Sequence, residues 1–330
     1  MPIILSREDL RQLLTMNEVI EAVEKGFSEY KMGHCFVPVR MPVKIEKEDG
    51  LFLFMPAYLE KGGSFGTKMI SIFPGNPQRG LSTLQSVYLL NDPTTGELLA
   101  MMDGIFPTAM RTGATSAVAT KYLARKEAAI MGIIGTGAQA PFQVEAVSAV
   151  RPIQRILAYD KISENTKDFS KNTSKNLDIP IEVVESPREV VVHSDILVTV
   201  TTSVEPVFDG RDLRPGTHVN AVGAYTPEMR EVDEITVKKA LIVVDTYEGC
   251  MAEAGDLLIP MRAGKLSEKD IYADLGEIVL GEKPGRTRND EITLFESVGF
   301  ALEDLVAARL AYQRAKEKGI GLRFTLGESA

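Results

Sequence analysis

AIMGIIGTGAQA, at residues 129–140, is the stretch that decides the fold. Its apolar first half predicts a buried strand, which opens directly into Gly135, Gly137 and Ala140. In a Gly-x-Gly-x-x-Ala loop the first glycine permits a tight turn and the second lets backbone N–H groups approach a pyrophosphate. The small third residue lets the next helix pack close to the sheet. The stretch predicts the phosphate loop of a dinucleotide-binding unit, with an ordinary glycine turn as the alternative.

The residues that follow favour the phosphate loop. A helix-compatible stretch covers residues 138–150, and QRILAYD then ends a second predicted strand on Asp160. Asp160 follows Gly135 by 25 positions, and a carboxylate that holds the adenine ribose stands about 20 residues into such a unit. A carboxylate at that place repels a 2′-phosphate, so it favours NAD. Lys161 beside it leaves NADP as the alternative.

Length and charge restrict the class of protein. A chain of 330 residues exceeds what one core usually holds, so we expect two domains. The net charge is −9, from 37 basic and 46 acidic residues, and no basic cluster interrupts it, which argues against a nucleic-acid partner. No signal peptide or membrane-length apolar stretch is evident, so we expect a cytoplasmic protein without a membrane partner.

The cysteines and histidines give no metal-site pattern. Cys35 and Cys250 lie far apart, and the histidines at 34, 193 and 218 lack a second ligand at metal-site spacing. We therefore expect free thiols and no bound metal.

The first third of the chain predicts a mixed α+β domain. A short strand and two helical stretches occupy residues 4–33. Short β-rich segments then recur with turn residues between them, which is typical of an antiparallel meander. These segments cover residues 37–46, 50–59, 63–73, 82–92 and 96–104, and residues 108–124 read as a helix that leaves the sheet.

Beyond residue 129 strands and helices alternate, which predicts a mostly parallel sheet covered on both faces. A final helix at 295–319 is long enough to return to the first domain. We predict an α/β protein with a Rossmann-type dinucleotide-binding domain at 112–311. An α+β substrate-binding and dimerisation domain at 1–111 is completed by 312–330. The expected parallel strands are 129–135, 154–160, 181–184, 195–201, 218–223 and 241–245.

Segments in both halves carry a family resemblance. They are FGTKMIS, LSTLQSVYLLNDPTTGELLAMMDG, TAMRTGATSAVATKYLA, IIGTGAQA, VTVTTSVEPVF, HVNAVGAYTPEMREVD and LFESVGFALEDLVAA. With these segments the chain resembles the ornithine cyclodeaminase and mu-crystallin family over nearly its whole length. The resemblance implies a nicotinamide-dependent enzyme for α-amino acids or their imines. It also implies a homodimer joined through the β-sheets of the non-nucleotide domains.

Three basic residues are candidates for the substrate site. On composition alone Arg40, Lys68 and Arg111 could each be solvated surface charges. The resemblance implies that all three hold the substrate carboxylate and that Lys68 also assists proton movement at the nitrogen. Met55 and Thr83, with Gln85, either line the same pocket or pack within the sheet.

The resemblance and the strand-end positions also give a set of cofactor-binding candidates. Ligands bind at the carboxyl edge of such a parallel sheet. The set comprises Thr112, Gly135, Thr136, Gly137, Ala138, Gln139, Asp160, Thr199, Thr201, Val222, Gly223, Ala224, Ser297 and Gly299.

Tyr225 departs from the family pattern, because cyclodeaminases and related alanine dehydrogenases place an aspartate there. A phenol, with an ordinary pKa of about 10, is a poor general base near neutrality, although it can orient a substrate. We therefore expect reduction of a preformed cyclic imine by NADH, Δ1-pyrroline-2-carboxylate to L-proline, with Δ1-piperidine-2-carboxylate as a second substrate. The alternatives are ornithine cyclodeaminase, alanine dehydrogenase, and a non-catalytic mu-crystallin-like binder.

Overall fold

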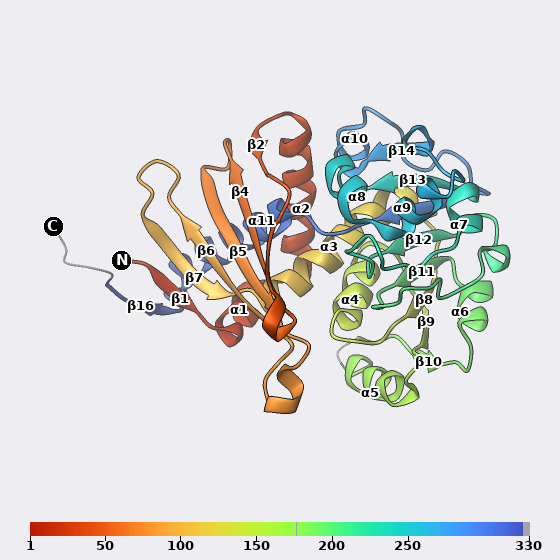
Figure 1. Cartoon of the computed structure of the whole chain (residues 1–330), viewed down its shortest axis with the longest axis horizontal. Helices are drawn as coiled ribbons and strands as arrows, with labels where there is room; N and C mark the ends of the chain where they lie inside the picture. The colour runs from red at the N-terminus through yellow and green to blue at the C-terminus, as the bar shows by residue number, and fades with distance from the viewer. Residues whose placement is uncertain (176, 326–330) are drawn as a thin grey trace. The chain divides into compact units, whose positions relative to one another are not determined.

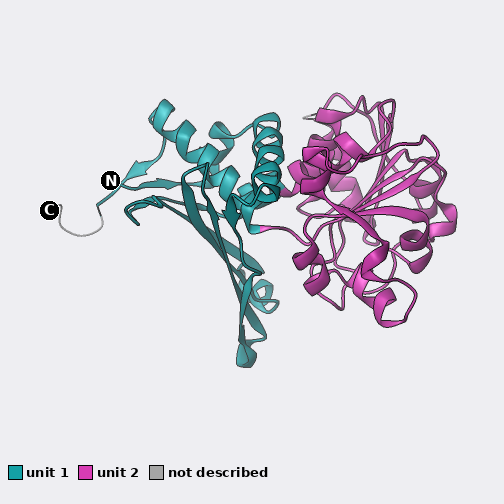
Figure 2. Cartoon of the chain, turned by 90° about the horizontal axis from the view of Figure 1, so that it is seen from above, with its two compact units in different colours: residues 1–111, 301–330 teal, residues 112–300 magenta. Residues whose placement is uncertain are grey.

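The computed structural model describes residues 1–175 and 177–325, and these form two compact units. Unit 1 consists of Met1–Arg111 and Ala301–Ala330, and unit 2 of Thr112–Phe300 (Figure 2). The chain thus leaves unit 1 after Arg111 and returns to it at Ala301, earlier than the expected return at residue 312. No helix in the described parts of the chain is long and apolar enough to cross a bilayer.

Unit 1 is a sheet covered by helices (Figure 1). The sheet order is β16-β1-β7-β6-β5-β4-β2, and β3 also pairs with β4. The long strands β4 to β7 are antiparallel neighbours, as the meander predicts, whereas β1 runs parallel to β7. The strands are β1 (Ile3–Leu5), β2 (Cys35–Phe36), β3 (Met41–Ile45), β4 (Gly50–Leu59), β5 (Ser64–Ile72), β6 (Leu84–Asn91), β7 (Leu98–Asp103) and β16 (Leu322–Arg323).

Alternation along the strands fixes the buried face of this sheet. In β4, Leu53, Met55, Ala57 and Leu59 are buried at every second position, as a half-buried strand requires. Helices α2 and α11 contact each other, and α11 also contacts strands β4 to β7. The helices of this unit are α1 (Arg7–Leu13), α2 (Met16–Lys31) and α11 (Ala301–Lys318), and α3 (Ile105–Leu123) leads from it into unit 2.

The single strand expected over residues 37–46 is wrong. Residues 37–40 lie in no strand and separate β2 from β3. Pro38, in this connection, has no N–H to donate to a neighbouring strand. Arg40 therefore lies on this connection rather than in a strand.

Unit 2 contains a parallel sheet of the Rossmann type. Its order is β10-β9-β8-β11-β12-β15-β13-β14, and every neighbouring pair is parallel. The strand order reverses between β8 and β11, which is where such folds bind their ligand. The strands are β8 (Ile130–Ile134), β9 (Arg155–Tyr159), β10 (Ile181–Val183), β11 (Ile196–Thr199), β12 (His218–Ala221), β13 (Ala240–Val244), β14 (Ile271–Asp274) and β15 (Ile292–Glu296).

Both faces of this sheet are buried. Along β11, Ile196 and Val198 join one cluster of buried side chains while Leu197 joins another, so successive residues face opposite cores. Helices therefore cover both faces. They are α4 (Ala140–Val150), α5 (Ser163–Thr173), α6 (Pro187–His193), α7 (Glu234–Lys239), α8 (Tyr247–Glu253), α9 (Gly255–Arg262) and α10 (Leu275–Leu280).

The last third of the chain differs from the prediction in its strands and in the start of its final helix. The sequence did not predict β14 or β15, and the final helix begins at Ala301, not at Phe295. Phe295 is fully buried in β15 between β12 and β13, so it belongs to the sheet. A short apolar run buried on both faces has no periodicity that separates strand from helix.

Candidate active site

The loop between β8 and α4 has the geometry of a phosphate cradle. Gly135 adopts φ +94°, and a Cβ there would lie 2.7 Å from the Val200 carbonyl oxygen, so only glycine fits. A Cβ added to Gly137 would have no atom within 4 Å, so the space next to this residue is open. Among the described residues, the N–H groups of Gly137, Ala138 and Gln139 have no hydrogen-bond acceptor. Such a run of unpaired N–H groups before a helix suits a pyrophosphate.

Asp160 lies directly after β9 and turns its carboxylate toward this loop. Oδ2 accepts from the Thr136 N–H at 2.8 Å and from the Thr136 hydroxyl at 3.2 Å. Oδ1 accepts from the Ile162 N–H at 2.9 Å. A carboxylate offers about four acceptor positions, so capacity remains for a ribose hydroxyl.

The carboxyl ends of β11 and β12 are joined by Glu231, a residue that sequence reasoning did not identify. Its fully buried carboxylate accepts from the Thr199 hydroxyl at 3.0 Å, the Thr201 N–H at 2.5 Å and the Gly223 N–H at 2.7 Å. The Thr199 hydroxyl and the Gly223 N–H are thus already hydrogen-bonded within the protein. The segment HVNAVGAYTPEMREVD contained this glutamate, but in sequence it looks like one more surface charge.

Asp245 directly follows β13 and, like Glu231, accepts hydrogen bonds from a loop at the carboxyl ends of the strands. Its Oδ2 accepts from the Ser297 hydroxyl at 3.0 Å and from the N–H groups of Val298 and Gly299 at 2.9 Å each. Gly299 has φ +86°, which fits the turn that follows β15. Asp245 thereby fixes residues 297–299, which include the cofactor-binding candidates Ser297 and Gly299.

The remaining nucleotide-side candidates are Val222, Ala224, Tyr225 and Thr112. The Val222 N–H donates to the Thr199 carbonyl at 3.0 Å, and Ala224 is buried. Tyr225 is half-buried in the loop after β12, and Thr112 is half-buried within α3.

In unit 1 a buried carboxylate joins two of the predicted cations. Asp304, in the first turn of α11, lies 2.8 Å from Lys68 Nζ and 3.1 Å from Arg111 Nε. Glu303 accepts from Arg111 Nη1 at 2.5 Å, and the Thr108 hydroxyl lies 3.2 Å from Asp304 Oδ1. All four charged residues are nearly inaccessible, with exposures of 1–5%. Sequence reasoning missed Glu303 and Asp304, although both stand in LFESVGFALEDLVAA.

The electrostatics of this cluster make Lys68 unusually acidic. Burial is the largest of the causes that lower the pKa of Lys68 to about 8; Arg111 and Arg40 act in the same direction, and Asp304 opposes them. Burial opposes ionisation of Asp304, yet Arg111 and Lys68 hold the pKa of that carboxyl below its usual range. The cluster is therefore charged at neutral pH and can release a proton from Lys68 near it.

The other substrate-side candidates differ in their placement. Met55 is the buried cross-strand neighbour of Lys68. Arg40 is near enough for its charge to act on Lys68. Thr83, just before β6, is half-buried, and its carbonyl accepts from the Phe73 N–H.

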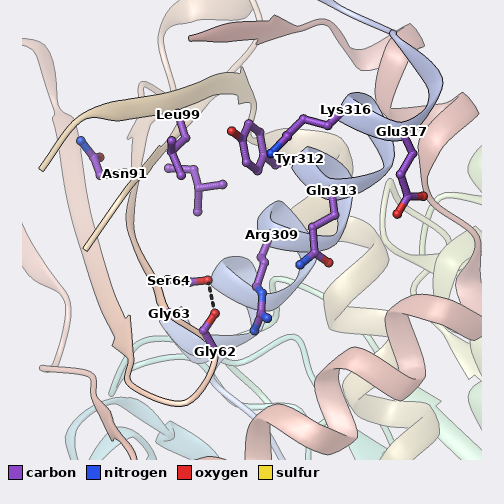
Figure 3. A pocket seen from close by; sticks show the side chains of 11 residues that line it. Gly62, Gly63, Ser64, Asn91, Leu99, Arg309, Tyr312, Gln313, Lys316 and Glu317 are labelled. Carbon is purple, nitrogen blue, oxygen red and sulfur yellow. Dashed lines mark hydrogen bonds between the residues drawn. The ribbon is translucent and has the colours of Figure 1, made fainter. Parts of the chain in front are cut away.

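A separate pocket of about 530 Å³ lies elsewhere in unit 1 (Figure 3). The turn between β4 and β5 lines it from one side and the second half of α11 from the other. Arg309, Tyr312 and Lys316 project toward it. None of the predicted site residues lines this pocket.

Comparison with known proteins places the chain in a family. The sequence pattern of the ornithine cyclodeaminase/mu-crystallin family matches residues 1–319. The chain belongs to the ornithine cyclodeaminase/mu-crystallin family. This confirms the resemblance drawn from its motifs.

Three members of the family match over nearly their whole length. A Δ1-pyrroline-2-carboxylate reductase of Bacillus cereus is 38% identical over 320 residues, 97% of this chain and 98% of that protein. The structure of the Thermococcus litoralis Δ1-pyrroline-2-carboxylate reductase in complex with NADH and L-proline is similar with a TM-score of 0.95. It shares 49% identity and covers 98% of this chain and 100% of that one. An archaeal alanine dehydrogenase dimer with bound NAD has a TM-score of 0.93 and 37% identity, with 99% of both chains covered.

Proposed function

We propose that this chain reduces a cyclic imine carboxylate with NADH, converting Δ1-pyrroline-2-carboxylate to L-proline. The observation that carries the proposal is the likeness to a reductase whose structure holds NADH and L-proline, at 49% identity over almost the entire chain. The buried cluster of Lys68, Arg111 and Asp304 supplies the chemistry that such a reaction needs.

The residues of the phosphate loop fit the nicotinamide dinucleotide. The unpaired N–H groups of Gly137, Ala138 and Gln139 would hold its pyrophosphate, and Asp160 would accept from the adenine ribose. When bound, the reduced nicotinamide supplies a hydride. Glu231 and Asp245 act on the loops around it by fixing the strand ends and the segment at 297–299.

Charge balance supports an anionic substrate. Lys68, Arg111 and Arg40 carry three positive charges, and Glu303 and Asp304 carry two negative ones. Cations outnumber anions among these five residues, which favours a substrate that carries a carboxylate. Arg40 acts on Lys68 through its charge, and the family resemblance implies that it holds the substrate carboxylate, so we assign it the main contact with that group.

Lys68 is the proton donor in the proposed reaction. Its ammonium carries three N–H bonds; Asp304 lies at 2.8 Å and the Thr108 hydroxyl at 3.3 Å. The third N–H has no acceptor among the described residues. As C2 of the imine gains the hydride, the C=N double bond becomes single and the ring nitrogen takes this proton. Lys68 then regains a proton from water.

A second candidate is oxidation of an amine, because an archaeal alanine dehydrogenase is 37% identical. That reaction must remove protons from a saturated amine, for which the family uses an aspartate where this chain has Tyr225. Imine reduction needs no base at that position, so it remains the first candidate.

Steady-state assays distinguish the two functions. Oxidation of NADH is followed with Δ1-pyrroline-2-carboxylate and with Δ1-piperidine-2-carboxylate. Reduction of NAD is followed with alanine, and release of ammonia and proline with ornithine and NAD, because cyclodeamination returns the hydride and leaves no net NADH. We expect efficient turnover of a cyclic imine and little of either amine. Ornithine conversion with ammonia and proline formed in equal amounts, as efficient as imine reduction, would instead promote ornithine cyclodeaminase.

We also propose a homodimer joined through the sheet of unit 1. Large apolar side chains of strands β2 to β6 are exposed to solvent in the single chain: Phe36, Met41, Val43, Ile45, Tyr58, Phe65 and Leu84. A second copy would cover them. Light scattering should give the mass of two chains, and Val43→Glu should reduce it to one. The unpaired thiols of Cys35 and Cys250 suit a reducing cytoplasm, where we expect the protein to act.

A further inference from the structure

We infer that Asp304 is the positioning residue of the substrate site, holding the Lys68 ammonium and the Arg111 guanidinium in one fixed arrangement. The inference rests on the proposed function for its chemical meaning. No motif in the sequence singles out this aspartate, and it touches neither the imine nor the nicotinamide in the proposed mechanism.

Geometry is the first support. Lys68 comes from β5, Arg111 from α3 and Asp304 from α11, so three distant segments meet at one carboxylate. Oδ2 takes the ammonium at 2.8 Å, while Oδ1 takes Arg111 Nε at 3.1 Å and the Thr108 hydroxyl at 3.2 Å. Because each oxygen serves a different cation, a rotation of the carboxylate would break both contacts.

The arrangement also directs the proton of Lys68. Asp304 Oδ2 attracts the ammonium as an ion pair at 2.8 Å, and the Thr108 hydroxyl accepts one of its N–H bonds at 3.3 Å. Its third N–H is thereby aimed in a fixed direction, which is what a proton donor to a ring nitrogen requires.

Asp304 further keeps the ammonium protonated. The groups that act on Lys68 are Arg111 from α3 and Arg40 from the connection before β3, both repulsive, and Asp304 from α11, which is attractive. Tyr88 faces Lys68 from β6, and burial holds the pKa of its hydroxyl well above the usual value, so it stays neutral. Asp304 is thus the attractive charge among the largest influences on the Lys68 pKa.

The test is Asp304→Asn, measured as the pH dependence of kcat/KM for Δ1-pyrroline-2-carboxylate. Activity needs protonated Lys68 and falls as the pH rises through its pKa. Without the carboxylate that fall should move to lower pH by about 1–3 units, the usual effect of one close opposite charge. Glu303→Gln is the matched control, because Glu303 contacts Arg111 but not Lys68. It should raise KM and leave the fall at its original pH.

A direct titration separates this inference from the proposed reaction. Selectively ¹³Cε-labelled lysine reports the protonation of Lys68, and the signal is assigned by its loss in Lys68→Met. We expect the titration midpoint to fall in Asp304→Asn even if neither imine is a substrate, in which case only the proposed function fails. Equal midpoints in the two proteins would overturn the inference.

Two further variants cover the case in which Asp304→Asn does not fold. Thr108→Val removes one acceptor of the ammonium and should lower the midpoint in the same direction by a smaller amount. Lys68→Met combined with Asp304→Asn removes the cation and the anion together. It should give folded protein where Asp304→Asn alone gives none, or unfold at a higher temperature where both fold. A double variant no more stable than the single one would contradict the pairing.

Discussion

Replacing Asp160 with serine should change the choice of cofactor. A hydrogen bond to a charged group contributes about 1.5–3 kcal/mol. A ribose hydroxyl that loses one such bond raises the KM for NADH by roughly 10–150-fold. The loss of the negative charge also removes the repulsion of a 2′-phosphate, so the ratio of NADPH to NADH efficiency should rise by at least this factor.

Asp160→Ser should also weaken the binding of both cofactors, and this common loss must be separated from the change in cofactor choice. Asp160 also accepts from the N–H and hydroxyl of Thr136, so Asp160→Ser loosens the phosphate loop for both cofactors. Thr136→Val, which removes the hydroxyl contact alone, measures part of that common loss and should weaken NADH and NADPH equally. Fluorescence titration of each cofactor without substrate gives the affinities directly. A variant that binds NADH as the unmodified protein does, or an unmodified protein that strongly prefers NADPH, would refute the placement of Asp160 at the ribose.

Four further outcomes are expected. Arg40→Met should lower kcat/KM for the imine by roughly 10–100-fold, mainly through KM, by loss of a charge-assisted hydrogen bond; Arg309→Ala, in the separate pocket, should leave it unchanged. Because burial lowers the pKa of Lys68 to about 8, imine reduction should decline as the pH rises through that value, and a rate still constant at pH 10 would exclude Lys68 as the donor. Tyr225→Phe should retain imine reduction if the ring only packs, whereas a large loss of kcat would show that its hydroxyl donates to the substrate. Arg151→Ala removes a guanidinium that donates to carbonyls at the C-terminal end of α3, and should lower the free energy of unfolding by about 2–4 kcal/mol in chemical denaturation.

The phosphate loop and the parallel sheet could be predicted because their signals are local. Gly135 needs a positive φ that few other residues adopt, and the apolar run before it is long enough to indicate a strand. Strand β15 escaped prediction because ITLFE is short and buried on both faces. It passes without a turn signal into the loop before α11, so it looked like the first turn of that helix.

The carboxylates that organise the site could not be found from spacing alone. Glu231, Asp245 and Asp304 are separated in sequence from the groups they hold, and acidic residues are mostly exposed in proteins. Only the tertiary fold buries them against N–H groups and cations. Family motifs contained Glu231 and Asp304, but they did not reveal which partner each one had.

The return of α11 to unit 1 has a consequence for the order of folding during synthesis. Unit 2 is contiguous, and its sheet is complete once β15 has been made. Unit 1, although its first 111 residues emerge earliest, lacks the helix that covers β4 to β7 and the strand that pairs with β1 until residues 301–323 follow. Since the chain is synthesised at about 5–20 residues per second, the apolar face of this sheet stays uncovered for many seconds on the ribosome. Unit 2, although second in the sequence, is therefore the first unit that can complete its hydrophobic core. A nascent chain stopped at residue 300 should contain a folded unit 2 and a unit 1 whose sheet is uncovered.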